Sequence, residues 1–222
     1  YKPKNDSPMV SNLRKNGLLI IGKTNTPEFG VGGQTFNEVF GTTSNPFNFK
    51  KTAGGSSGGA AAAVQSKLIP FADGSDMMGS LRTPSSFCET FSIRPTPGLV
   101  PSNSTLSYKM PRISTNGVIA RHPMDLALML DGCIGKKACF EKLIRNKFSL
   151  RKVTACIPEN YLENILLDNK VTKQFYQNIE TFKKLGVKIK KINFDFEPNL
   201  FWESWIDLRS KIISLDLKKE FE

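Results

Sequence analysis

Residues 54–63 read GGSSGGAAAA, a pair of serines framed by glycines and followed at once by a run of alanines. Alanine is the best helix former, so the run predicts a helix with Ser56 and Ser57 at its entrance. Glycine tolerates unusual backbone angles and lets another chain or a substrate approach closely. The segment therefore predicts a tight, functional turn at a helix start rather than a flexible linker.

Two other interpretations of this turn remain open. Backbone N–H groups at a helix start attract phosphate, but a P-loop ends in Gly-Lys-Ser/Thr, and here Ala60 follows Gly59. The segment also fits the G-x-S-x-G nucleophile elbow of α/β-hydrolases. Ser56 would then be the nucleophile and His122, the single histidine of the sequence, the base, with Asp73 or Asp76 as its partner.

Outward from this turn, apolar runs alternate with turn residues and predict an α/β fold, a mixed twisted sheet with helices on both faces. In chain order we expect a buried strand at 17–22, a helix start at 26–28, a loop over 30–55, a strand at 68–72, a short helix at 81–88, irregular chain over 91–120 and a core helix from 123 to about 132 or 135. We expect one domain over residues 1–222.

The last third of the chain predicts a further helix-strand region over about 150–222. A strand at 153–157, an amphipathic helix at 171–182, a strand at 187–189 and a final helix at 201–215 follow in order. The apolar face of that final helix needs a cover. The cover would be either the remainder of a longer protein or a second copy, which makes a homo-oligomer one possibility.

Composition narrows the class of protein. Of the 222 residues, 39% are hydrophobic and 23% charged, as in soluble globular proteins. The net charge of +11 is spread along the whole chain instead of forming a basic stripe, so we do not expect a nucleic-acid partner. No apolar run approaches the roughly 20 residues of a membrane span. Because the chain begins at Tyr1 and not at methionine, we expect a piece of a longer product.

The cysteines predict no metal site. Cys88, Cys133, Cys139 and Cys156 form no C-x-x-C pair, and one histidine is too few for the usual zinc patterns. We expect reduced, mostly buried thiols and a cytoplasmic location.

Several blocks then point to a known family. They are GKTNTPEF at 22–29, FGTTSNP at 40–46, the turn at 54–59, GSDMMGSLRTPS at 74–85, IRPTPG at 93–98 and the stretch 116–130. In content and order they resemble the blocks of the amidase-signature hydrolases. The resemblance covers about residues 8–135; the region after 150 is consistent with it but far less specific.

The resemblance implies a reaction and a set of residues. By motif position Ser80 is the nucleophile, Ser56 the bridging serine after a cis peptide bond, and Ser57 a supporting residue. A neutral lysine is the base, and a small-molecule carboxamide is hydrolysed through an acyl-enzyme, without metal or organic cofactor. The backbone N–H groups of residues 77–80 (Met77, Met78, Gly79 and Ser80) would form the oxyanion hole. Gly30 would line the substrate channel, and Asp76 and Arg82 would brace the loop.

Two features depart from the family pattern. The family's lysine lies further upstream than the 55 residues before Ser56 allow, and Lys23 belongs to a different block, so the base would lie outside this chain. Met78 stands where a glycine is typical, and it would disfavour the backbone angle that glycine allows. These departures leave a second hypothesis, an inactive amidase-like fragment that serves as a binding or scaffold domain. The identity of the amide is not encoded in these motifs.

Overall fold

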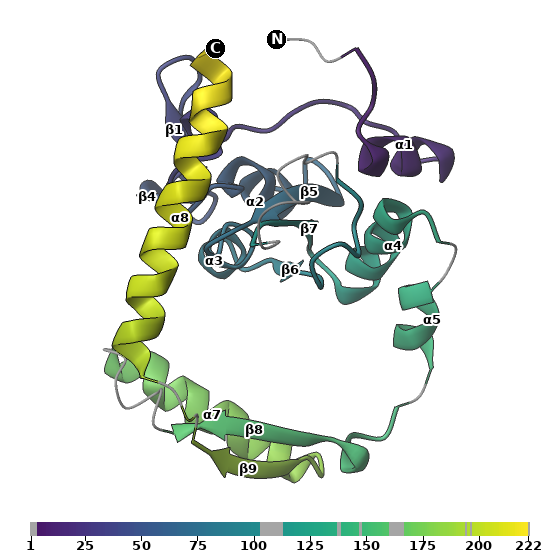
Figure 1. Cartoon of the computed structure of the whole chain (residues 1–222). Coiled ribbons are helices and arrows are strands. Elements are labelled where there is room, and N and C mark those ends of the chain that lie inside the picture. Colours follow the sequence, from purple (N-terminus) through teal and green to yellow (C-terminus); the bar gives the residue numbers. More distant parts are fainter. Residues whose placement is uncertain are drawn as a thin grey trace. The chain divides into compact units, whose positions relative to one another are not determined.

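The computed structural model describes residues 4–102, 113–136, 139–146, 148–159, 167–193, 195 and 197–221. Its contacts divide the chain into two compact units, residues 1–146 and residues 147–222 (Figure 1). Each unit has its own secondary structure, and a single domain over the whole chain stays a prediction.

The first unit is built on a three-stranded antiparallel sheet. Its strands are β5 (Phe71–Asp76), β7 (Thr115–Ala120) and β6 (Phe91–Ile93), in the order β5-β7-β6. Phe71 pairs with Ala120 and Asp76 with Thr115, so β5 and β7 match over six residues. β5 is an edge strand of this sheet.

Helices cover both faces of the sheet (Figure 1). They are α2 (Gly58–Gln65) and α3 (Arg82–Phe87) on one face, and α1 (Pro8–Lys15) and α4 (Pro123–Ile134) on the other. A short helix, α5 (Cys139–Arg145), packs on α4.

The two faces follow from the alternation of side chains along each strand. Ala72 and Ile119 belong to the core under α2, whereas Val118 belongs to the core under α4, with Phe71 packed against it. The expected α/β class with flanking helices is therefore confirmed. The sheet of this unit is antiparallel, and the parallel strand pair lies in the second unit.

Several helix predictions are confirmed. α2 begins directly after the two serines, and α3 lies within the range expected for a short helix. α4 has Pro123 in its first turn, and Gly135 ends it in the left-handed conformation at φ 74°. Proline fits a first helical turn, and glycine adopts the left-handed cap without a steric penalty.

The strand expected at residues 17–22 is wrong. This segment has no regular secondary structure, and Leu19 and Ile21 are 89% and 78% exposed. An apolar run becomes a buried strand only when a neighbouring strand supplies hydrogen bonds, and the described residues contain no such neighbour. The helix start expected at 26–28 is a single 3-10 turn, η1 (Glu28–Gly30), preceded by Pro27.

The two stretches expected to be irregular contain short strands. Residues 30–55 form two small antiparallel pairs: β1 (Phe36–Asn37) with β2 (Gly41–Thr42), and β3 (Ser44–Asn45) with β4 (Asn48–Thr52). Strands of two residues are too short to produce a periodic pattern. Residues 91–120 contain β6 and β7, and residues 103–112 lie outside the described part. The strand expected at 68–72 begins later, at Phe71.

The second unit is a β-α-β arrangement with an additional long helix. β8 (Thr154–Pro158) and β9 (Lys188–Ile192) are parallel, and α7 (Asn169–Lys184) connects them. These elements and α8 (Pro198–Phe221) follow the predicted order, and a 3-10 turn that was not predicted, η3 (Leu150–Lys152), precedes β8. Leu200 and Trp202 on α8 are 63% and 57% exposed, so the need for a cover persists, and a second copy as that cover stays a prediction.

The two cores predict a contrast between neighbours on α4. Leu130 is 1% exposed, and Leu128, two residues earlier, is 41% exposed. We expect Leu130→Ala to lower the free energy of unfolding by about 2–5 kcal/mol and Leu128→Ala by less than about 1 kcal/mol. Urea denaturation followed by circular dichroism measures both. Equal losses would contradict the assignment of Leu130 to the core.

The thiols predict a second contrast. All four cysteines are free, with Cys88 and Cys133 buried and Cys139 and Cys156 exposed, so the expectation of mostly buried thiols holds for half of them. Burial raises the pKa of Cys88 to about 11, and burial together with the charge of Asp73 raises that of Cys133 to about 12. The thiolate is the form that reacts with iodoacetamide. At neutral pH the reagent should therefore alkylate Cys139 and Cys156 readily, and Cys88 and Cys133 only after unfolding. Peptide mass spectrometry identifies which cysteines are alkylated before and after unfolding.

Candidate active site

The glycine-serine turn is held by the hydroxyl of Thr35, whose side chain is buried. Thr35 Oγ1 lies 2.8 Å from the carbonyl oxygen of Gly54 and 3.2 Å from that of Ser56, and it accepts the N–H of Gly58 at 3.0 Å. The peptide bond between Gly55 and Ser56 is cis, at the position where the resemblance implies one. Thr35 was not predicted, because a lone threonine in a loop gives no signal of such a role.

Two glycines of the turn stand where no side chain fits. A β-carbon on Gly55 would lie 2.8 Å from the backbone of Gln34, and one on Gly59 would lie 2.5 Å from the backbone of Asn25. The end of a flexible side chain could move aside at such distances, but these backbone atoms cannot. The close approach of neighbouring chain therefore accounts for these two glycines of the frame.

The loop that carries Ser80 is organised by the carboxylate of Asp76, which is fully buried. Its oxygens accept the backbone N–H groups of Gly79 at 2.8 Å and Leu81 at 3.2 Å. The guanidinium of Arg82 donates to both oxygens at 3.0 Å. The loop is thus folded around one buried anion.

Asp76 is charged at neutral pH. Burial alone would raise its pKa, but hydrogen bonds from Arg82 and the loop backbone, together with the charge of Arg82, outweigh burial and hold the pKa below its ordinary value. Arg94 adds a second cation at 3.5 Å. A carboxylate held in this way anchors structure and is unsuited to accept protons near neutral pH.

Ser57 joins the turn to the Ser80 loop and to β5. Its N–H donates to the carbonyl of Ser80 at 3.2 Å, and its hydroxyl lies 3.4 Å from both the N–H and the carbonyl of Ser75. Ser56 and Ser57 are each 6% exposed, and Ser80 is half-buried. The structure therefore brings together the two segments that carry the predicted serines.

The expected oxyanion donors are not equivalent in the structure. The N–H of Gly79 is directed at Asp76, whereas the described residues offer no acceptor to the N–H groups of Met77, Met78 and Ser80. The left-handed angle of this loop falls on Gly79, at φ 106°, and Met78 does not adopt one. Methionine therefore meets no left-handed backbone at position 78, and its effect on the oxyanion hole stays a prediction.

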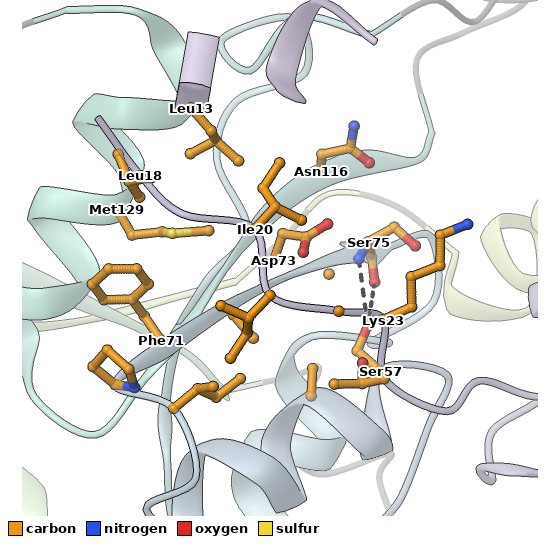
Figure 2. Close-up of a pocket in the computed structure, with 18 of the residues that line it drawn as sticks. Leu13, Leu18, Ile20, Lys23, Ser57, Phe71, Asp73, Ser75, Asn116 and Met129 are labelled. Carbon is orange, nitrogen blue, oxygen red and sulfur yellow. Dashed lines mark hydrogen bonds between the residues drawn. The ribbon is translucent and has the colours of Figure 1, made fainter. Parts of the chain in front are cut away.

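A cavity of about 790 Å³ lies beside the serine turn (Figure 2). Ser56, Ser57 and Gly30 lie on its wall, and Ser80 is not among the described residues that line it. No sequence pattern indicates this cavity, because its walls come from segments far apart in the chain.

The rest of the wall is largely apolar, with a few polar side chains near the serines. The apolar lining residues include Leu18, Ile20, Phe71 and Met129 (Figure 2). The polar lining residues include Lys23, Asp73, Ser75 and Asn116. Figure 2 shows the Lys23 side chain extending away from Ser57, and no described hydrogen bond joins them.

Asp73 is the acidic group of this wall. Its side chain is reached by solvent through the cavity, yet surrounding protein removes enough hydration to raise its pKa, and its own backbone N–H offsets part of that rise. The described residues include no cation paired with it. Only the tertiary structure shows that Asp73 lies on this wall and not beside a histidine.

The register of the sheet separates His122 from the serines. His122 follows β7, whose Ala120 pairs with Phe71, while Ser57 contacts Ser75 near the other end of β5. Four strand residues span about 13 Å. His122 is the N-cap residue of α4, and this geometry does not support the elbow triad.

The described residues hold neither a metal cluster nor a membrane-crossing helix. No group of three or more histidine, cysteine, aspartate or glutamate side chains suited to a metal ion occurs among them. In the same part of the chain, every helix is too short or too polar to cross a membrane.

Comparison with known proteins extends this picture. The Amidase family model matches residues 1–208. A glutamyl-tRNA(Gln) amidotransferase subunit from Legionella pneumophila is 32% identical over 206 residues, which cover 89% of this chain and 42% of the relative. The chain thus spans about two-fifths of the length of the curated relatives it matches.

Two solved structures give the same result. A bacterial aryl acylamidase of the amidase signature family superposes with a TM-score of 0.77 at 27% identity, covering 98% of this chain and 47% of its own. A 6-aminohexanoate cyclic dimer hydrolase gives 0.75 at 29% identity, with 86% and 42% covered. The chain belongs to the amidase family.

The buried anion predicts a pH-dependent stability. The folded-state pKa of Asp76 is depressed, so its stabilisation is present above the ordinary carboxyl pKa of about 4 and is lost as pH falls through the lower folded value. We expect Asp76→Asn to cost about 3 kcal/mol at pH 7, and the difference from wild type to shrink in acid.

The matched control is Asp6→Asn, which removes an exposed ion pair with Arg14. It should change the free energy of unfolding by less than about 1 kcal/mol at any pH. Chemical denaturation between pH 3 and pH 7 measures both variants. A cost for Asp76→Asn no larger than that for Asp6→Asn would contradict the anchoring role.

Proposed function

We propose that this chain carries the serine half of an amide-hydrolysing site, in which Ser80 attacks the carboxamide carbonyl and Ser56 relays its proton to a lysine outside this chain. Family membership supports the reaction class, since the similar proteins include an acylamidase and a cyclic-amide hydrolase. The observation that carries the proposal is the hydrogen bond from the N–H of Ser57 to the carbonyl of Ser80, which holds the two serine segments together.

In the proposed relay, the Ser80 hydroxyl forms a bond to the carbonyl carbon while its proton passes to Ser56 Oγ. Ser56 in turn gives its own proton to the neutral lysine amine. The tetrahedral intermediate collapses when the lysine returns a proton through the same relay to the leaving nitrogen, and the C–N bond breaks. Water then hydrolyses the acyl-enzyme. This is nucleophilic catalysis with a base acting through an intermediate hydroxyl.

The free backbone donors support charge stabilisation in that intermediate. Within the described residues the N–H groups of Met77, Met78 and Ser80 have no acceptor, so they are available to a developing oxyanion. A donor placed there contributes about 3 kcal/mol to the transition state. Gly79 is less suited to this role because its N–H already serves Asp76.

The place of the base is supported by the cavity. Ser56 and Ser57 lie on its wall, so a lysine side chain that enters the cavity would reach Ser56. Lys23 also lines this space, but it extends away from Ser57 and we assign it no proton transfer (Figure 2).

A second candidate is the ammonia-releasing role of an amidotransferase. It is favoured by the 32% identity to the glutamyl-tRNA(Gln) amidotransferase subunit of Legionella pneumophila. The attack on a carboxamide would be the same, with glutamine as the amide and ammonia as the product. Comparing glutamine with anilide and cyclic amides as substrates separates the two candidates.

The test of the proposed function begins with the gene. A lysine codon in the reading frame upstream of Tyr1, in a Val-Lys-Asp-like context, would supply the base. A fluorophosphonate probe is then applied to the 222-residue chain and to the longer protein. We expect Ser80 to be labelled in the longer protein and only weakly, if at all, in the chain.

Four variants of the longer protein sharpen this test. Ser80→Ala should abolish labelling, and Ser56→Ala should slow it about 10²–10⁴-fold. His122→Ala and Lys23→Met should leave it unchanged. Loss of labelling in His122→Ala with folding intact would favour the elbow triad. No labelling in any form would favour an inactive scaffold domain.

A further inference from the structure

The short helix α5 is fixed to the first unit at its first turn. It lies beside α4 (Figure 1). The buried carboxylate of Asp131 accepts the N–H groups of Phe140 and Glu141 at 2.9 and 3.1 Å. The Phe140 side chain packs against the core that contains Val118 and Leu130. Any surface that α5 presents to a partner is therefore held in a defined position on this unit.

The apolar face of α5 extends beyond its buried first turn. Leu143 and Ile144 follow Phe140 by three and four residues, which places all three on one face of the helix. Phe140 is half-buried, whereas Leu143 and Ile144 are 62% and 45% exposed. Large apolar side chains gathered on one exposed face indicate a contact surface.

Basic side chains border this face. Lys142 and Arg145 on α5 are exposed, and Lys136 precedes the helix. Arg145 Nε lies 2.7 Å from an oxygen of Glu141, and within the described residues no carboxylate pairs with Lys142. The sequence of residues 136–152, KKACFEKLIRNKFSLRK, has seven basic residues and one acidic residue, a net charge of +6. Totals over the whole chain hide this local excess.

The combination of positive charge and apolar surface indicates the kind of partner. Basic side chains attract a negatively charged surface, and aliphatic side chains add to the binding only where an apolar region lies directly beneath those charges. A nucleic-acid backbone offers the negative charge without such an apolar region. The surface of a bilayer with anionic lipid offers both.

Two other occupants fit less well. A protein that encloses a basic amphipathic helix in a groove needs access to most of the helix, and the first turn of α5 is already packed on its own unit. A second copy of this chain, docked through the same face, would bring two basic segments together. Like charges placed side by side oppose association.

We propose that α5, with the basic residues that flank it in the sequence, binds the surface of a membrane that contains anionic lipid. Leu143 and Ile144 enter the boundary between headgroups and acyl chains, while Lys142 and Arg145 stay at the level of the headgroups. The contact is peripheral and involves no span of the bilayer. It concerns binding alone and does not depend on catalysis at Ser80.

The probe is a vesicle of phosphatidylcholine and phosphatidylserine in equal parts, compared with a vesicle of phosphatidylcholine alone. Co-sedimentation measures how much of the 222-residue chain binds each vesicle. We expect the anionic vesicle to bind about tenfold more strongly or better, because each basic side chain near an anionic surface adds to the attraction. Added salt should weaken this binding, since it screens the charges.

A matched pair of double variants tests the charges. Lys142→Gln combined with Arg145→Gln should weaken binding to the anionic vesicle about tenfold. The control makes the same change at Lys183 and Lys184 of α7, an exposed pair in which Lys183 likewise bonds a glutamate. This control should change binding by less than about twofold, because the attraction falls off within a Debye length.

A second matched pair tests the apolar contact. Leu143→Ala should weaken binding about tenfold, since the lost methyl groups no longer leave water for the lipid. Leu185→Ala, at a leucine that is 52% exposed directly after α7, should leave binding unchanged. Far-UV circular dichroism of all variants checks that the helices are retained.

The two exposed cysteines report which part of the chain meets the vesicle. Cys139 begins α5, and Cys156 lies in β8. An environment-sensitive fluorophore on Cys139, in a Cys156→Ser chain, should shift its emission to the blue on binding. The same fluorophore on Cys156, in a Cys139→Ser chain, should show no shift.

Several results would overturn the proposal. Equal binding to neutral and anionic vesicles would indicate nonspecific apolar adhesion, and no binding to either would remove the proposed role. Binding of soluble polyglutamate without binding of vesicles would make an acidic polypeptide the partner. Vesicle binding by this chain that is absent from the longer protein would show that other polypeptide covers α5. Equal losses in the α5 and α7 variants would place the contact elsewhere.

Discussion

The site depends on one buried anion. Asp76 stands at the end of β5, and its carboxylate draws the N–H groups of Gly79 and Leu81 and the guanidinium of Arg82 around itself. A buried charge is costly unless it is fully hydrogen-bonded, so the chain after β5 is held in the one conformation that satisfies it. That conformation fixes Ser80 and directs the N–H groups of residues 77, 78 and 80 away from the carboxylate.

The serine turn is held by a second, uncharged group, the hydroxyl of Thr35. Thr35 comes from a loop about twenty residues away in the sequence and bonds the turn at three points. The glycines at 55 and 59 allow neighbouring chain to pass at distances that a side chain would prevent. Ser57 then connects this centre to the other, through Ser80 on one side and Ser75 on the other. Two rigid loops joined by one residue are a suitable support for groups that must meet within hydrogen-bonding distance.

The cavity lies open beside the two serines of the turn, Ser56 and Ser57. It reaches the buried serines from the edge of β5 and is bounded by an apolar segment that forms no strand. Leu19 and Ile21 of that segment are largely exposed, and within the described residues no cation pairs with the carboxylate of Asp73. The chain spans about two-fifths of the length of the curated relatives it matches.

By itself, the sequence determined the helix after the serine turn, the core helix from Pro123 to Gly135, the β-α-β order of the last third and, through blocks in order, the family. These features are local: they follow from helix propensity, caps and motif spacing. Only the tertiary structure decided that residues 17–22 form no strand, that residues 30–55 hold short hairpins, and that His122 lies far from the serines. It also revealed Thr35, the engaged N–H of Gly79 and the place of Asp73 in the cavity. Those features depend on which distant segment supplies a hydrogen-bond partner, and no local pattern contains that information.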